Sequence, residues 1–123
     1  LYDCAMIKDN HKLAAGSVSA AYQAIRRTFP EVDIQVEVTT VAEALEAYAV
    51  GARFIMCDNM SVPLLAETVA ALRAQDEPVE IEATGGLTLE VAREYALTGV
   101  DYLSVGGLTH SSPILDIALD LAD

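Results

Sequence analysis

The chain has 123 residues, of which 53% are hydrophobic and 21% charged, a balance that suits one compact domain and argues against disorder. Its formal net charge of −12 at pH 7 argues against nucleic acid and anionic membranes as partners. No apolar run approaches the roughly 20 residues of a membrane span, and no basic and then apolar leader opens the chain, so we expect a cytoplasmic protein.

Cys4 and Cys57 both stand in apolar, strand-like surroundings. We interpret them as two buried free thiols rather than as a disulfide, in keeping with a cytosolic setting. The acidic composition also means that an anionic ligand must be held by local features. Suitable features are backbone amides, helix N-termini, a metal ion or a single lysine.

The first strand is predicted over residues 4–7, and a polar stretch, residues 8–11, follows at its C-terminal end. Because natural domains seldom begin inside a core strand, we expect the protein to continue upstream. The first helix is predicted over residues 17–29, whose apolar side chains recur at helical spacing, and Pro30 ends it.

The second strand is predicted over residues 34–38, where alternation places Glu37 on the opposite face from its valine neighbours. A charge within a buried strand needs a partner. Residues 40–43 fit a capping box that begins the second helix, which Gly51 closes. The acids of the helices, among them Glu43, are interpreted as solvated helix faces.

The apolar run 54–57 predicts a strand buried on both faces, and Asp58 follows it directly. In α/β folds this C-terminal edge of the sheet is where ligands bind. The plainer alternative is that Asp58 only caps or turns the loop into the next helix. That helix opens at residues 61–63 and is predicted to run to about Gln75.

Two more strand and helix units complete the chain. Residues 79–83 predict a strand, residues 84–86 a turn, and residues 88–99 a helix that Thr88 caps. Residues 102–105 predict the fifth strand. Ser112 and Pro113 are typical of an N-cap and first helical position, so a last helix is predicted to run close to the terminus.

Five such units in a row predict a parallel sheet with right-handed crossovers. A complete (β/α)₈ barrel takes about 250 residues, so the chain accounts for about half of one. We therefore expect an α/β fold in which residues 1–123 form a single partial barrel domain, part of an irregular TIM-like barrel.

The residues suited to chemistry all follow strands, so they are expected along one edge of the sheet. They are Lys8 to His11, Glu37, Asp58 with Asn59, the turn Thr84-Gly85-Gly86, and Gly106, Gly107, Thr109 and His110. Two neighbouring acids can hold a divalent cation through water, bind a ribose or stabilise a cation. Glycine-rich turns that open helices suit a phosphate group. Taken singly, the lysine, the glycines and the histidines could be ordinary loop residues.

The chain resembles the C-terminal part of the quinolinate phosphoribosyltransferases, also called carboxylating nicotinate-nucleotide pyrophosphorylases. The resemblance rests on segments that follow one another over almost the whole chain: residues 7–11, 36–38, 55–60, 82–86, 98–101 and 105–111. The spacings also fit the family, with 29 positions from Lys8 to Glu37 and 21 from Glu37 to Asp58.

The resemblance implies phosphoribosyl transfer from phosphoribosyl pyrophosphate to quinolinate with decarboxylation, in NAD biosynthesis. It implies Mg²⁺ as the cofactor, held by Glu37 and Asp58 through water, and a homo-oligomer in which a partner subunit closes the site. Lys8, Glu37 and Asp58 would be both catalytic and substrate-binding. The implied phosphate-binding residues are Thr84, Gly85, Gly86, Val105, Gly106 and Gly107, with His110 nearby.

The sequence departs from the family in two turns, with Thr84 where serine is usual and Gly107 where alanine is common. The family's N-terminal domain, first barrel units and quinolinate-binding cations are not found in these residues. One alternative is therefore a catalytically inert fragment or phosphate-binding module of a TIM-like barrel, and another is a different phosphate-handling barrel. For the site itself, we predict that Glu37 and Asp58 lie at neighbouring strand ends and face a shared cleft.

Overall fold

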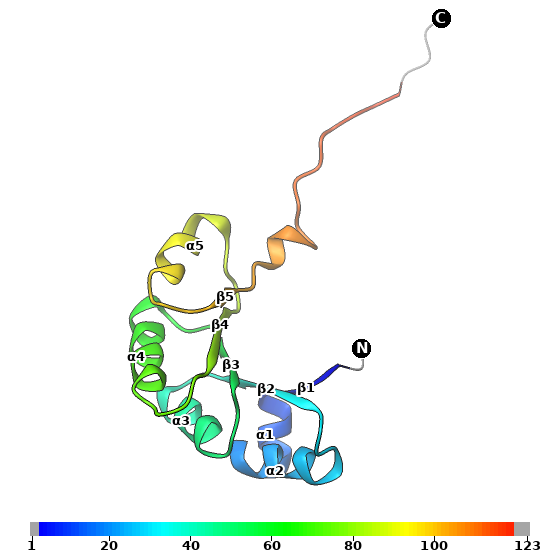
Figure 1. The fold of residues 1–123 in the computed structure, drawn as a ribbon. Helices are drawn as coiled ribbons and strands as arrows, with labels where there is room; N and C mark the ends of the chain where they lie inside the picture. The colour runs from blue at the N-terminus through cyan, green and yellow to red at the C-terminus, as the bar shows by residue number, and fades with distance from the viewer. Residues whose placement is uncertain (1–2, 120–123) are drawn as a thin grey trace, which may run out of the picture.

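The computed structural model describes residues 3–119 and shows one parallel sheet in the strand order β1-β2-β3-β4-β5 (Figure 1). The strands are β1 (Cys4–Ile7), β2 (Asp33–Val38), β3 (Phe54–Asp58), β4 (Glu80–Thr84) and β5 (Tyr102–Leu103). Each strand pairs with the strand that precedes it in sequence, so the sheet grows in one direction. The predicted run of parallel strands is confirmed.

The helices cover one side of this sheet. They are α1 (Asp9–Ala15), α2 (Val18–Thr28), α3 (Val41–Ala49), α4 (Val62–Arg73) and α5 (Leu89–Ala96), followed by a short 3-10 helix, η1 (Gly106–Leu108). Figure 1 shows an arc with the strands along its inner side and the helices outside. The arc is an open part of a TIM-like barrel, which confirms the predicted fold class.

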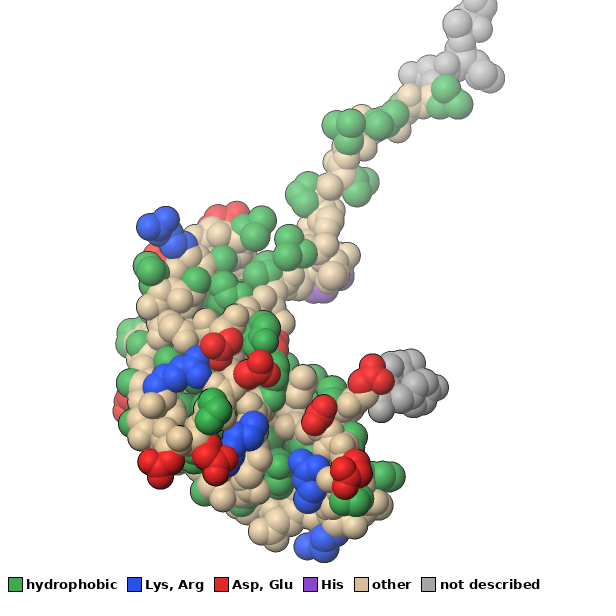
Figure 2. Space-filling model, viewed as in Figure 1, with side chains coloured by type: hydrophobic (Ala, Val, Ile, Leu, Met, Phe, Trp, Pro, Cys, Tyr) green, Lys and Arg blue, Asp and Glu red, His purple; other side chains and the backbone are tan. Residues whose placement is uncertain are grey.

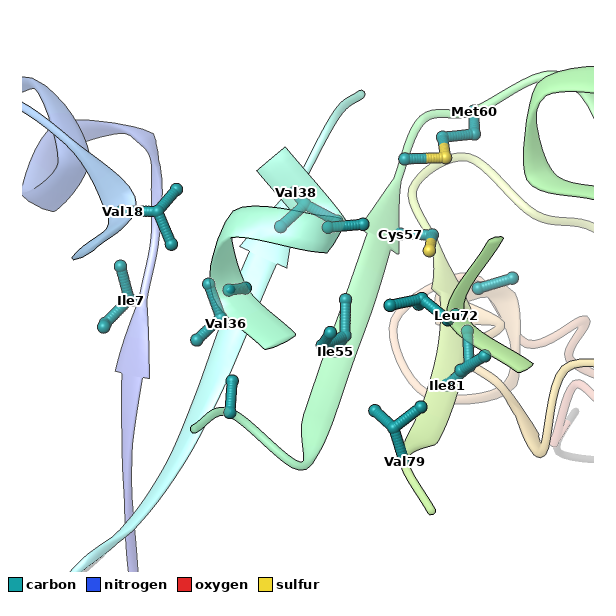
Figure 3. Close-up of a cluster of buried hydrophobic side chains, with 14 of the residues drawn as sticks. Ile7, Val18, Val36, Val38, Ile55, Cys57, Met60, Leu72, Val79 and Ile81 are labelled. Carbon is teal, nitrogen blue, oxygen red and sulfur yellow. The ribbon is translucent and has the colours of Figure 1, made fainter. Parts of the chain in front are cut away.

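The two faces of the sheet differ because successive side chains of a strand point to opposite sides. Toward the helices, β1 to β4 contribute Ile7, Val36, Ile55 and Ile81, each completely buried (Figure 3). These side chains pack with helix residues such as Leu72, and their burial is the main stabilising contribution to the arc. The packing that stabilises the sheet is therefore on its outer side, against the helices.

The inner face is more polar than the sequence predicts. The pairing register sets Glu37 opposite Met56 and Met56 opposite Glu82, so the three lie in one row across the sheet. Phe54 and Asp58 of β3 are only half-buried. The prediction of a strand buried on both faces over residues 54–57 is wrong at Phe54, because no helix among the described residues covers the inner face.

Local signals explain the starts of α2 and α3, but neither the predicted capping box nor the predicted cap at Thr88 forms. Ser17 caps α2, since its Oγ accepts from the Ala20 N–H at 3.0 Å. Thr40 caps α3 in the same way, but the Glu43 carboxylate accepts from Thr39 rather than completing the predicted capping box. Thr88 occupies the N-cap position of α5 without making a capping hydrogen bond through its side chain.

Helix α1 is absent from the sequence prediction. It has seven residues, too few for a recognisable apolar stripe, and it begins directly after β1. The backbone N–H of Lys8 donates to Nδ1 of His11 at 3.0 Å, which closes the first turn. Gly16 ends the helix in a left-handed conformation with φ of 97°.

The predicted last helix is wrong within the described residues. Residues 113–119 have no regular structure and extend away from the arc (Figure 1, Figure 2). Ser112 Oγ donates to the Leu108 carbonyl at 2.8 Å, so it closes η1 instead of capping a new helix. An amphipathic helix is stabilised mainly by packing of its apolar face. Among residues 3–119, Ile114 and Leu115 lack such packing, since they are 90% and 81% exposed.

The fifth strand is also shorter than predicted, at two residues. Cys4 is exposed rather than buried, because it opens the edge strand β1, whereas Cys57 is buried at the centre of the sheet. Both are free thiols, as predicted. Between residues 3 and 119 no helix is long and apolar enough to cross a membrane.

We predict that the two thiols differ sharply in reactivity. Burial raises the pKa of the Cys57 thiol to about 12, so it stays protonated and inaccessible at pH 8. Iodoacetamide should alkylate Cys4 in the native protein and reach Cys57 only after unfolding, as followed by peptide mass spectrometry. Alkylation of both residues at the same rate in the folded protein would contradict the placement of β3.

Candidate active site

Lys8 and Glu37 form an ion pair across the ends of the first two strands. Lys8 follows β1 directly, and its Nζ lies 3.1 Å from Oε2 of Glu37 near the end of β2. The Glu37 side chain is only 10% exposed, whereas that of Lys8 is 54% exposed. The prediction that Glu37 needs a partner is confirmed, since a buried carboxylate is costly without one.

Asp58 lies on the same face as this pair. Glu37 is in register with Met56, and Asp58 comes two residues after Met56, so both acids project from the inner face. Asp58 is the last residue of β3 and accepts from Asn59 Nδ2 at 2.8 Å. The predicted position of both acids at the C-terminal ends of neighbouring parallel strands is confirmed, and they face the open inner side of the arc.

Glu82 is a third carboxylate toward the C-terminal ends of the strands on this face, and the sequence analysis missed it. It continues the row of Glu37 and Met56 onto β4, and Ser104 donates to its Oε1. The signal was present in the alternation of Glu80, Glu82 and Thr84, which places all three on one side of the strand.

The acids on this face do not form a closed metal site. Over residues 3–119, no three His, Cys, Asp or Glu side chains gather as a group that could hold a metal ion. Two carboxylates on one face still fit Mg²⁺, because this ion commonly keeps several waters and takes one or two carboxylates together with substrate phosphates.

The turn after β4 is in tight contact with the turn after β3. The Asn59 N–H donates to the Thr84 carbonyl at 3.0 Å, and Asn59 has a left-handed φ of 51°. A Cβ added to Gly85, whose φ is 86°, would lie 2.6 Å from Cγ of Asn59. Only glycine therefore satisfies both the conformation and the contact at this position.

A similar close contact shapes the turn after β5. The His110 N–H donates to the Gly106 carbonyl at 3.1 Å, and the imidazole lies against Gly106. A Cβ at Gly106 would stand 2.6 Å from Nε2 of His110. The missing side chain thus lets the histidine ring fold back over the turn.

A pocket of about 500 Å³ lies between these two glycine turns. Of the predicted phosphate-binding residues, Gly86, Val105, Gly106, Gly107 and His110 line it. Thr84 and Gly85 are not part of its lining, although they shape the turn that leads to it. A second cavity of about 630 Å³ lies at the opposite edge of the sheet, where the strands begin, and its lining includes Arg26 and Arg53.

The beginning of α5 opens into the first of these pockets. Thr88, Leu89 and Glu90 line it, and Thr88 leaves the first amides of the helix without a side-chain cap. Such amides and the positive end of the helix dipole are suited to an anion. The pocket lining contains no Lys or Arg and one acid, Glu90, so any attraction for an anion there would come from these amides.

The sequence matches that of known proteins over almost its whole length. A sequence profile described as the C-terminal domain of quinolinate phosphoribosyl transferase matches residues 1–120. The chain belongs to this family.

Relatives and solved structures agree with the family assignment. The carboxylating nicotinate-nucleotide pyrophosphorylase of Mycobacterium leprae is 46% identical over 124 residues, which cover 98% of this chain and 43% of that protein. The structure of the Francisella tularensis nicotinate-nucleotide pyrophosphorylase superimposes with a TM-score of 0.81 at 32% identity, over 89% of this chain and 38% of that one. A NadC deletion mutant gives a TM-score of 0.85 at 35% identity, over 94% and 40%.

The chain spans less than half the length of these relatives. It therefore corresponds to part of the quinolinate phosphoribosyltransferase structure, and the part it covers contains the ion pair, the third acid on the inner face and the glycine-lined pocket. These features lie on consecutive units of one sheet, so their relative positions depend on the sheet itself and on the two glycine turns.

We predict that Gly85→Ala destabilises this family member and Gly107→Ala does not. Alanine at Gly85 would require a left-handed conformation and would clash with Asn59, at a cost of about 1–3 kcal/mol from the conformation alone. No atom lies within 4 Å of a Cβ at Gly107, which serves as the matched control. Thermal denaturation of both variants tests this. Equal midpoints would show that the turn after β4 does not contact the turn after β3 as described.

Proposed function

We propose that the natural protein transfers the phosphoribosyl group of phosphoribosyl pyrophosphate to quinolinate, with decarboxylation, in NAD biosynthesis. It would be a pentosyl-transferring enzyme whose products are nicotinate mononucleotide, pyrophosphate and CO₂. The observation that carries the proposal is the Lys8–Glu37 ion pair, which shares the inner face of the sheet with Asp58. Relatives that match nearly the whole chain are named for this activity.

The glycine-lined pocket is the proposed site of the 5′-phosphate. Gly86, Gly106 and the first turn of α5 would present backbone N–H groups, and His110 lies at the same pocket. Phosphate held by backbone amides needs no cationic side chain, which suits a chain with seven Lys and Arg against nineteen Asp and Glu.

Glu37 and Asp58 are the proposed electrostatic groups. Transfer of a ribosyl group builds positive charge at the ribose carbon, and fixed carboxylates on one face stabilise such a charge without having to reorganise. When Mg²⁺ is bound, it neutralises the pyrophosphate, and these two carboxylates would hold it through water. Burial of Glu37 favours its role, because its charge is shielded little by solvent.

Lys8 is the proposed contact to an anionic substrate group. Its ammonium has three donors, and Glu37 accepts from Nζ at 3.1 Å. Because more than half of the Lys8 side chain is exposed, the remaining donors can reach a carboxylate or phosphate oxygen. When no substrate is bound, the pairing with Glu37 keeps the ammonium at the inner face.

The second charge of quinolinate requires cations beyond those on this face. In a protein of the relatives' full length, an N-terminal domain and further barrel units would supply them, and a partner subunit of a homo-oligomer would close the site. A cytoplasmic location follows from the same proposal, as the setting of a biosynthetic enzyme acting on small molecules.

The alternative is an inert module that binds phosphate. It is favoured by one observation, namely that the pocket between the two glycine turns is lined only by residues 86–113. Calorimetric titration with phosphoribosyl pyrophosphate and Mg²⁺, beside a quinolinate turnover assay, separates the two when it is done on the natural protein as well as on the isolated 123 residues, since the alternative predicts binding without turnover from both. We expect binding without turnover from these residues alone, and turnover from the natural protein.

We predict that Glu37→Gln and Asp58→Asn each lower turnover of quinolinate by the natural protein by at least about 10²-fold, the scale of one lost preorganised electrostatic contact. Both changes keep the size of the side chain and remove its charge. The control is Glu67→Gln, which removes an exposed charge on α4 and should leave turnover unchanged.

Turnover can be followed as release of CO₂ from carboxyl-labelled quinolinate. A natural protein without this activity, when demonstrably folded, would refute the proposed function. Activity that survives both substitutions within a few-fold would instead refute the roles given to Glu37 and Asp58.

A further inference from the structure

A second lysine lies one helical turn beyond Lys8 and is almost completely buried. Lys12 Nζ is 2.7 Å from Oδ1 of Asp9 and 3.2 and 3.1 Å from the two carboxylate oxygens of Glu43. The residue is 8% exposed, whereas its neighbour Leu13 is 83% exposed. Lysine is rarely buried unless it is paired, so this arrangement requires an explanation.

The pairing keeps Lys12 charged. Burial lowers the pKa of the ammonium, but the hydrogen bonds from it to Asp9 and Glu43, together with their negative charges, outweigh burial and raise its pKa above the ordinary value. The sequence-based interpretation of Glu43 as a solvated helix face is wrong, because its carboxylate contacts this buried cation.

Glu43 continues the connection to the end of β2. Its Oε2 accepts from the Thr39 backbone N–H at 2.8 Å and from the Thr39 hydroxyl at 3.2 Å. Thr39 follows β2 directly and stands two residues after Glu37. The segment after β1 and the segment after β2 are thus joined twice, by Lys8 with Glu37 and by Lys12 with Glu43 and Thr39.

The backbone of α1 makes the two connections move together. The Lys12 N–H donates to the Lys8 carbonyl at 3.1 Å, and the His11 N–H donates to the same carbonyl at 2.9 Å. Lys8 and Lys12 therefore belong to one hydrogen-bonded turn. A displacement of Lys12 relative to Thr39 would displace the base of the Lys8 side chain relative to Glu37.

We propose that Lys12 is a positioning residue for the active site, holding the end of β1 against the end of β2 at the separation where Lys8 meets Glu37. The catalytic consequence rests on the proposed function. The exposed and flexible Lys8 side chain fixes this separation poorly by itself, since half-exposed ion pairs contribute little. A buried lysine with two carboxylate partners fixes it much better, and displacements of about 1 Å in an active site can cost about 10²-fold in rate.

The test uses the natural protein with Lys12→Met, with Lys12→Arg, and with Lys12→Met combined with Glu43→Gln. The combined variant leaves no unpaired carboxylate at Glu43, so it remains informative if Lys12→Met alone fails to fold. The matched control is Arg73→Met, which removes a cation 2.7 Å from Asp101. Like Glu43, Asp101 also accepts from a backbone N–H, that of Ile81.

We expect Lys12→Met and the combined variant to lower kcat about tenfold or more, with KM for phosphoribosyl pyrophosphate changed less than about threefold. Lys12→Arg should recover most of the lost kcat. Arg73→Met should lower the thermal midpoint and leave kcat unchanged. If the Lys12 variants and Arg73→Met lower kcat equally at equal loss of stability, Lys12 only stabilises the fold and the proposal is overturned.

Two readouts do not depend on turnover. Hydrogen exchange at the Thr39 amide and the rate of reductive methylation of the Lys8 amino group both report whether the two strand ends stay together. Both rates should rise several-fold in Lys12→Met and in the combined variant, and unchanged rates overturn the proposal. If the wild-type protein shows no turnover, the proposed function fails, while these two rates still decide the role of Lys12.

Discussion

The ion pair between Lys8 and Glu37 is the constraint on which the rest of the site depends. The Glu37 side chain, which is only 10% exposed near the end of β2, must be compensated, and the cation comes from the neighbouring strand end. This requirement accounts for the contact between the ends of the first two strands, which the parallel pairing of β1 with β2 already sets side by side. It also leaves an ammonium with free donors beside a fixed negative charge, which is the arrangement that a reaction with charged intermediates needs.

The two faces of the sheet have different roles: the outer face stabilises the fold, and the inner face carries the side chains suited to chemistry. Aliphatic residues of β1 to β4 pack under the helices, while acids and hydroxyls occupy the inner face and the strand ends. The proposed phosphate site lies elsewhere, at backbone amides between two glycine turns. A strongly acidic chain can thus combine carboxylates for a positive centre with a separate pocket in which backbone amides face an anion, because the two sites use different parts of the backbone.

The sequence predicted the features that depend on local pattern and missed those that depend on tertiary contacts. Apolar runs located the strands, and alternation around Glu37 placed it on the inner face. The last helix was wrong within the described residues, because its capping signal at Ser112 serves η1 and its apolar side chains up to residue 119 are exposed. Burial of Lys12 and exposure of Cys4 follow from their neighbours in space, which no local pattern encodes.

A crystal structure of the natural protein with phosphoribosyl pyrophosphate and Mg²⁺ tests the account most directly. The account predicts the 5′-phosphate in the pocket lined by Gly86, Gly106 and His110, and the ribose and pyrophosphate on the inner face beside Glu37 and Asp58. Binding of the ligand in the cavity at the opposite edge of the sheet, with the inner face free of ligand, would contradict it.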